Sequence, residues 1–136
     1  MSRKKGKAPT QRQLRVGEEL RHILAEIIGR GELHDPILAG KSITVAEVRP
    51  SPDMRHATVY VMPLGGGDDA KEIVGALNHA AHFLSHEIGR RITMKFTPLV
   101  HFELDPTFDE AQRIDRILRQ PGVARDLAND GVDDGS

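Results

Sequence analysis

Residues 71–92 read KEIVGALNHAAHFLSHEIGRRI, and this stretch decides the fold of the chain. Apolar side chains recur at helical spacing on both sides of its centre, but the second set is offset from the first. The centre, residues 78–82, consists of small and polar residues. Two consecutive helices that meet at an angle would produce this offset, and so would a single bent helix. The stretch therefore predicts an interrupted pair of helices.

Extended segments are predicted on both sides of this helix pair. Residues 43–49 alternate imperfectly between two faces, and residues 57–62 are rich in β-forming side chains. Pro50-Ser51-Pro52-Asp53 between them is typical of a turn, so a hairpin is the economical interpretation. After the helix pair, residues 93–104 alternate apolar and polar side chains and predict one long strand, in which Pro98 marks an edge position or a bulge.

Helix starts are marked by polar residues three positions apart, because the first side chain can accept a hydrogen bond from an unpaired helix N–H group. Three such starts are predicted: Thr10 with Gln13, Asp69 with Glu72, and Thr107 with Glu110. The first helix carries an apolar stripe formed by Val16, Leu20, Ile23, Leu24 and Ile27, and it ends at Gly29 and Gly31. The order of elements places the chain in the α+β class.

Length and composition fit one small domain. The chain has 136 residues, of which 38% are hydrophobic and 29% charged, and this leaves little room for a second core. We expect a flexible basic arm over residues 1–9, a folded domain over 10–120 that includes a C-terminal helix over 107–119, and a flexible acidic tail over 121–136. The net charge of −1 conceals this asymmetry. Basic residues without any acid open the chain, and they are Arg3, Lys4, Lys5, Lys7, Arg12 and Arg15. We predict that they contact RNA phosphates, because neutralising phosphates releases counterions.

Several classes of protein and site are not favoured. The chain lacks cysteine, which excludes disulfides and thiolate metal sites and agrees with a reducing, cytoplasmic compartment. No export signal or membrane-spanning apolar run is readable, and no catalytic motif is present. The three glycines at 65–67 lack the lysine of a phosphate-binding loop, so a connector is favoured. His79, His82 and His86 lie near one helix face, but surface histidines are favoured over a metal site.

Positive charge and hydrogen-bond donors surround the interruption of the helix pair. The candidate phosphate contacts there are Lys71, His79, His82, Arg90, Arg91 and Lys95. Small side chains between them would allow an RNA backbone to approach closely. An ordinary solvated helix surface would carry similar residues, and spacing alone does not separate the two interpretations.

The order helix, strand, strand, helix, helix, strand is that of the type II KH fold, and the sequence resembles the bacterial ribosome-binding factor A family over roughly residues 10–118. The matching stretches are Val16-Gly17-Glu18-Glu19-Leu20, the strand pair through Val48-Arg49-Pro50-Ser51-Pro52-Asp53, Leu77-Asn78-His79-Ala80-Ala81, Arg90-Arg91-Ile92, Pro98-Leu99-Val100-His101-Phe102, and residues 109–115. A KH domain clamps the nucleic-acid backbone with a GxxG loop between two helices. The resemblance implies that this family uses a helix-kink-helix with an Ala-x-Gly element instead. Here that element reads Ala80-Ala81-His82, so His82 stands where the family pattern has glycine.

The resemblance implies a fold and a function. The fold would be a single type II KH-like domain with a three-stranded sheet packed on helices and a short C-terminal helix. The protein would bind the immature small (30S) ribosomal subunit through 16S ribosomal RNA and assist late maturation and pre-rRNA processing, with a role in growth at low temperature. Asn78, Ala80 and Ala81 join the candidate RNA contacts. No catalytic residue, metal, cofactor, small-molecule substrate or membrane partner is implied, and a monomer is expected. The alternative is a KH-like adaptor that contacts proteins through its hairpin and acidic tail.

Overall fold

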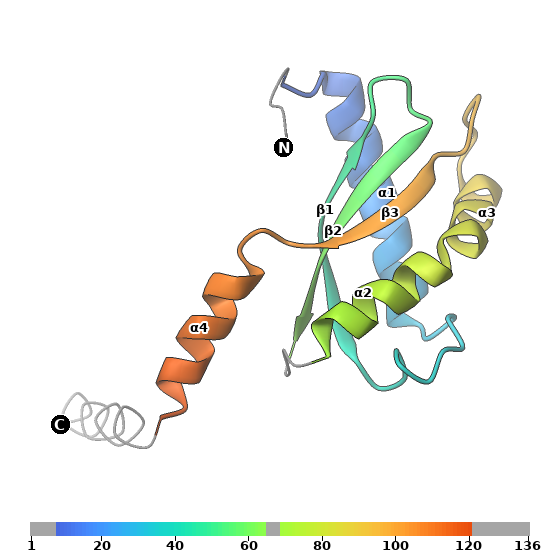
Figure 1. Cartoon of the computed structure of the whole chain (residues 1–136). Helices are drawn as coiled ribbons and strands as arrows, with labels where there is room; N and C mark the ends of the chain where they lie inside the picture. Colours follow the sequence, from blue (N-terminus) through green and yellow to red (C-terminus); the bar gives the residue numbers. More distant parts are fainter. Residues whose placement is uncertain (1–7, 65–68, 121–136) are drawn as a thin grey trace, which may run out of the picture. The chain divides into compact units, whose positions relative to one another are not determined.

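The computed structural model describes residues 8–64 and 69–120, which fall into two compact units that divide between Asp105 and Pro106. The first unit contains α1 (Gln11–Gly29), β1 (Ser42–Pro50), β2 (His56–Leu64), α2 (Ala70–His79), α3 (Ala81–Arg91) and β3 (Leu99–Leu104), as Figure 1 shows. The second unit contains α4 (Phe108–Leu118). The predicted α+β class and order of elements are confirmed. The acidic tail and the three glycines lie outside the described residues.

The three strands form one sheet in the order β1-β2-β3. β1 and β2 are antiparallel, which confirms the predicted hairpin, and β2 and β3 are parallel. Along β2 the buried side chains alternate with half-buried ones, so a single face of the sheet is covered. In β1 the register shifts between Val45 and Glu47, and this bulge lets both Val45 and Val48 face the core. The bulge explains why the alternation in this strand is imperfect in the sequence.

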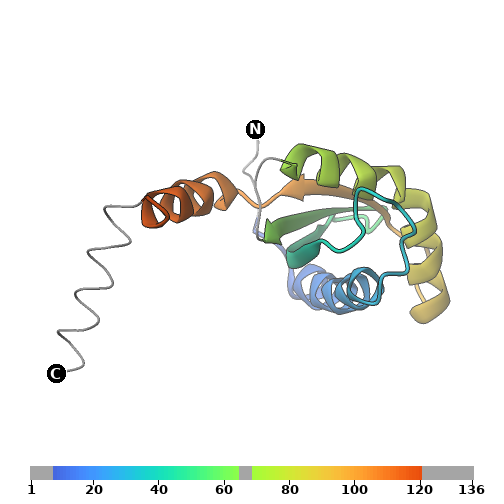
Figure 2. The ribbon, with the colours of Figure 1, turned by 90° about the horizontal axis from the view of Figure 1, so that it is seen from below.

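The helices supply the covering layer. Figure 2 shows α1 beside β1 and α2 beside β3. Leu20, Leu24 and Ile27 of α1 are fully buried in one apolar cluster with Leu77 of α2 and Phe102 of β3. Each such aliphatic side chain contributes about 1.5–3 kcal/mol through its burial. The predicted apolar stripe of α1 is thus confirmed as the face that closes the core.

The start of α1 is held tightly against the end of β1. Thr10 and Gln13 form the predicted capping box, and the Gln13 side-chain amide also donates to the carbonyl oxygen of Pro50 at 3.0 Å. One turn later, a Cβ atom added to Gly17 would fall well inside 3.0 Å of the Val48 carbonyl oxygen. Only a residue without a side chain allows this approach of helix to strand.

The other two predicted caps are wrong in their side-chain bonds. Asp69 and Thr107 occupy the N-cap positions of α2 and α4, but neither side chain makes a capping hydrogen bond. Their ψ angles are 15° and 2°, whereas Thr10 has the extended value of 166° that directs a side chain back to the helix N–H groups. The Asp69 carboxylate instead pairs with Lys41 at 2.5 Å.

The predicted strand over 93–104 is wrong in its first half. The structure has an irregular connector over 93–98, and β3 begins only at Leu99. Pro98 is buried at the junction and has no N–H group to donate to a ladder. Phe96, which appeared to continue the apolar face, is instead 39% exposed. Within the part of the chain that the structure describes, no helix is long and apolar enough to cross a membrane.

Candidate nucleic-acid interface

The break in the helix pair lies at Ala80, which caps both α2 and α3. Its φ of −91° and ψ of 8° depart from helical values, so the chain turns at this one residue. Its N–H is shared between the carbonyl oxygens of Leu77 at 3.0 Å and Ala76 at 3.2 Å, and its own carbonyl accepts from the Leu84 N–H at 2.9 Å. The hydrogen-bond ladder therefore continues on both sides of the bend. The prediction of two consecutive helices is confirmed.

The bend does not require glycine at position 82. Among the described residues, Met54 is the only non-glycine with a positive φ, so His82 has a backbone conformation that any residue adopts. The His82 side chain is exposed, whereas Ala81 beside it is buried. His82 thus adds an imidazole to the surface at the bend, and the helix break forms with histidine at this position.

Two polar side chains of the helix pair satisfy the outer edge of β3. The Asn78 amide accepts from the Phe102 N–H at 2.7 Å and donates to the Phe102 carbonyl at 3.1 Å. The Ser85 hydroxyl donates to the Pro98 carbonyl at 2.9 Å. These groups face away from β2 and would otherwise form an open strand edge. Asn78, a candidate RNA contact, therefore uses its side-chain amide within the fold.

A shallow hollow of about 370 Å³ lies where the bend meets β3 and the start of β2. Its polar lining includes His56, His82 and His101, which come from three different elements. Each imidazole can donate or accept a hydrogen bond, so the hollow offers polar contacts beside the buried Ala81. His101 also lies 3.4 Å from the Glu103 carboxylate. In the described ranges, no group of three or more histidine and acidic side chains is arranged to hold a metal ion.

The two arginines at the end of α3 have different surroundings. Arg90 is largely exposed, and its ion pair within the described part of the chain is with Glu87, at 3.3 Å. Arg91 has a side chain only 26% exposed, and its guanidinium lies 3.5 Å from both Glu26 and Glu32 and 3.7 Å from Glu87. Arg91 therefore ties α3 to the end of α1, while Arg90 remains available to a partner.

The remaining candidate contacts are spread over the first unit. Arg12, Arg91 and Lys95 line one hollow between α1 and the 93–98 connector, together with Glu19. Arg15 and Lys71 are exposed on other surfaces, and His79 is exposed at the end of α2. Arg3, Lys4, Lys5 and Lys7 lie outside the described residues. The structure thus brings Arg12 and Lys95 together across 83 positions of sequence, which no local pattern indicates.

The structure contains an aromatic ring with two cations beside it, which the sequence did not predict. The Arg55 guanidinium lies 3.9 Å from the centre of the Phe96 ring, and the Lys95 ammonium lies 5.6 Å from it. Arg55 stands in the turn between β1 and β2, whereas Phe96 belongs to the connector before β3. The alternation over residues 93–104 places Phe96 on the apolar side of the predicted strand, so the sequence does not predict its exposure. Only the folding of these two segments against each other creates the group.

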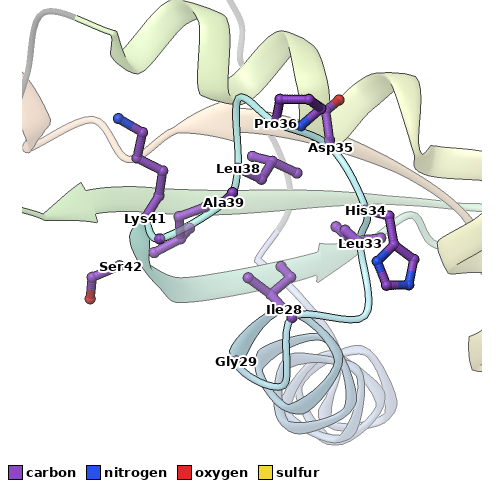
Figure 3. A pocket seen from close by; sticks show the side chains of 13 residues that line it. Ile28, Gly29, Leu33, His34, Asp35, Pro36, Leu38, Ala39, Lys41 and Ser42 are labelled. Carbon is purple, nitrogen blue, oxygen red and sulfur yellow. The ribbon is translucent and has the colours of Figure 1, made fainter.

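A hollow of about 730 Å³ lies beneath the connector between α1 and β1 (Figure 3). Its apolar lining includes Ile28, Leu33 and Leu38. Its charged side chains already have partners, because Asp35 accepts from the Ile37 N–H at 2.9 Å and Lys41 pairs with Asp69. Asp69 in turn has a lowered pKa, mainly through the hydrogen bond from Lys41. The hollow thus combines apolar packing with a structural ion pair.

Comparison with known proteins identifies the family. The family model described as ribosome-binding factor A matches residues 12–118, which is most of the chain. The chain belongs to the ribosome-binding factor A family. It is 55% identical over 128 residues to ribosome-binding factor A of Paramagnetospirillum magneticum, a match that covers 94% of this chain and 89% of the relative. It is also 55% identical over 121 residues to ribosome-binding factor A of Maricaulis maris, covering 89% of this chain and 85% of that protein.

Solved structures of ribosome-binding factor A share the fold. The crystal structure of the Thermus thermophilus protein matches with a TM-score of 0.57 at 29% identity, covering 68% of this chain and 94% of that one. A homology model of the Thermus thermophilus factor, fitted into an electron cryomicroscopy map of its complex with 30S, matches with a TM-score of 0.51 at 32% identity. That match covers 64% of this chain and 88% of the other.

Proposed function

We propose that this protein binds the immature small ribosomal subunit through 16S ribosomal RNA and assists its late maturation and pre-rRNA processing without catalysis of its own. The observation that carries the proposal is the match to a ribosome-binding factor A that occupies a 30S complex. Identities above 50% to further members of the family support it. We expect a cytoplasmic monomer that needs no cofactor.

The proposed RNA surface has two parts. The first is the bend, where the exposed imidazoles of His79 and His82 flank Ala80. The second is the opposite end of α3, where Arg90 and Lys95 are exposed. Contacts of this kind neutralise phosphates and release counterions, so they supply affinity that falls as the salt concentration rises. The basic residues before position 8 are expected to add further phosphate contacts.

The protein would act on the RNA through binding alone, without catalysing a reaction. A protein that binds one arrangement of the RNA more tightly than others shifts the population toward that arrangement in proportion to the difference in affinity. Interactions within the fold that keep the proposed RNA surface in its shape contribute to RNA binding indirectly. Asn78 and Arg91 belong to this group, because their side chains bond to Phe102 and to three carboxylates within the fold.

The alternative, an adaptor that acts mainly through protein contacts, has one observation in its favour. α4 exposes the apolar side chains of Ile114, Ile117 and Leu118, each more than 40% exposed. An apolar helix face of this kind is a common protein-binding surface. The two functions differ in whether ribosomal RNA is needed for binding.

Cosedimentation with purified small subunits tests the proposal, with large subunits as the control. We expect saturable binding to small subunits that is lost after ribonuclease treatment and weakens as salt is raised. Arg90→Gln combined with Lys95→Gln should lower the affinity and reduce the slope of log K against log salt concentration by about 1–2. Thr44→Gln is the matched control, since it alters an exposed residue on another element. Binding that survives ribonuclease would favour the adaptor.

A further inference from the structure

An exposed aromatic ring lies beside two cations at the end of the domain where β1 meets β2. The Phe96 ring is 39% exposed, with the Arg55 guanidinium 3.9 Å and the Lys95 ammonium 5.6 Å from its centre. In the described ranges 8–64 and 69–120, no carboxylate lies within salt-bridge distance of either cation, although the charge of Arg55 contributes to lowering the pKa of Asp53. A cation that is held against an exposed ring without a salt bridge can contact a planar, negatively charged partner.

The backbone around Arg55 is held firmly. The Ser51 N–H donates to the His56 carbonyl at 2.7 Å, and the Asp53 carboxylate accepts from the Ser51 hydroxyl at 2.6 Å and from the Arg55 N–H at 3.0 Å. The hydrogen bond from Ser51 is the main reason why the pKa of Asp53 is lowered. These bonds fix the turn before any partner arrives.

Two further contacts fasten this turn to the rest of the domain. The Arg55 carbonyl accepts from the Leu99 N–H at 2.9 Å, which joins the turn to the start of β3. Met54 is buried although its φ is 63°, a strained conformation for a residue with a side chain. The Arg55 and Phe96 pair is therefore presented by a preorganised support, which reduces the entropy lost on binding.

The Asp53 carboxylate lies beside Arg55, whereas the charge on the Lys95 side of the ring is mainly positive. Lys95 also lines the hollow that contains Arg12 and Arg91, and Glu19 is the acid in that lining. Arg91 is neutralised by its own carboxylates, so Arg12, Arg55 and Lys95 remain as the available cations. A guanidinium that stacks on a ring keeps its N–H groups directed outward in its own plane, where they can reach a phosphate.

We propose that Phe96 and Arg55 form a stacking platform for an unpaired base of ribosomal RNA, with Arg55 and Lys95 contacting the phosphates beside that base. The inference rests on the proposed function and adds to it a contact with single-stranded RNA outside the helix bend. Bases in single strands stack on aromatic rings and arginine planes, whereas bases inside a duplex are not accessible in this way. The platform therefore distinguishes unpaired RNA from paired RNA.

The test uses the full chain, purified small subunits, and a short single-stranded RNA that contains 2-aminopurine, with its duplex as the comparison. Phe96→Leu removes the ring and keeps an apolar side chain. We expect it to weaken binding of the single strand by on the order of 10-fold or more, to abolish the quenching of 2-aminopurine fluorescence, and to leave the salt slope and duplex binding unchanged. Phe96→Tyr should bind as the wild type does. Arg55→Gln should lower the salt slope by about 0.7. Thermal melts check that each variant is folded.

The possible outcomes separate this inference from the proposed function. If the wild type binds small subunits but a folded Phe96→Leu variant binds the single strand equally well, the platform is wrong and the proposed function stands. If Phe96→Leu loses affinity for small subunits but not for free RNA, the ring contacts a protein and the RNA assignment is overturned. If the wild type binds neither small subunits nor single-stranded RNA, both proposals fail together.

Discussion

Replacing Gly17 by alanine should destabilise the domain, although alanine is the better helix-forming residue. The new Cβ atom would lie well inside 3.0 Å of the Val48 carbonyl oxygen and 3.2 Å from the Pro50 ring. Both obstacles are parts of the β1 backbone or of a rigid ring, so neither can rotate away. Helix α1 would have to move from the sheet by a large fraction of an ångström, in an interior packed as densely as a crystal.

The magnitude follows from two opposing terms. Overpacking of a dense interface costs about 1–3 kcal/mol, and the gain in helix propensity returns at most about 1 kcal/mol. We expect a net loss of roughly 1–2 kcal/mol, which lowers the melting temperature by about 5–15 °C in a domain of this size. Chemical denaturation followed by circular dichroism measures the free energy of unfolding directly.

Gly75 in α2 provides a matched control. It is also a glycine inside a helix, but a Cβ atom added there meets nothing within 4 Å. Gly75→Ala should therefore raise the free energy of unfolding by up to about 1 kcal/mol, since the propensity gain is unopposed. The opposite signs of the two substitutions isolate the contact with β1. A Gly17→Ala variant as stable as Gly75→Ala would refute the close approach of α1 to the strand.

Three further predictions concern polar interactions that hold the fold together. Asn78→Leu should lower the free energy of unfolding by about 1–3 kcal/mol, because the backbone N–H and carbonyl of Phe102 lose their hydrogen-bond partner. Urea titration measures this change. An unchanged midpoint would show that water replaces the amide. Arg91→Gln should lower the melting temperature, because it leaves three carboxylates facing one another. Arg90→Gln should leave the melting temperature nearly unchanged, because Arg90 pairs with Glu87 alone among the described residues. Equal melting temperatures for the two variants would contradict this difference in pairing. Asp69 has a folded-state pKa below its ordinary value of 3.8, so its ion pair stabilises the fold above that pH and is lost as the pH falls below it. Asp69→Asn should therefore flatten the acid limb of a plot of stability against pH, and an identical limb would contradict the contribution of this pair.

Local sequence patterns predicted those features that depend on neighbouring residues. Three predictions of this kind are confirmed: the interruption at residues 78–82, the hairpin over 43–62 and the capping box at Thr10. Periodicity and turn chemistry act within a few positions, so the sequence alone is enough to predict them. The same patterns failed at Asp69 and Thr107. Their side chains fit a cap, but their backbone angles were decided by how the chain enters each helix.

The candidate site was less accessible to sequence reasoning than the fold. Arg90 and Arg91 are identical neighbours in the sequence, yet one is exposed and the other is held by acids from α1 and its following loop. Asn78 appeared to be a surface donor and instead satisfies the edge of β3. These differences arise from residues between 24 and 65 positions apart. Charge alone does not reveal them.

By itself, the sequence determined the class of the fold, the order of its elements and, through its resemblance to known relatives, the family to which it belongs. The class and the order follow from the spacing of apolar residues and from turn and capping residues, which express the local geometry of helix and strand. Only the tertiary structure decided which charges are free, where the strand after the helix pair begins, and that Arg55 meets Phe96. Such features depend on contacts between distant segments, and those contacts exist only once burial of the common core has brought the segments together.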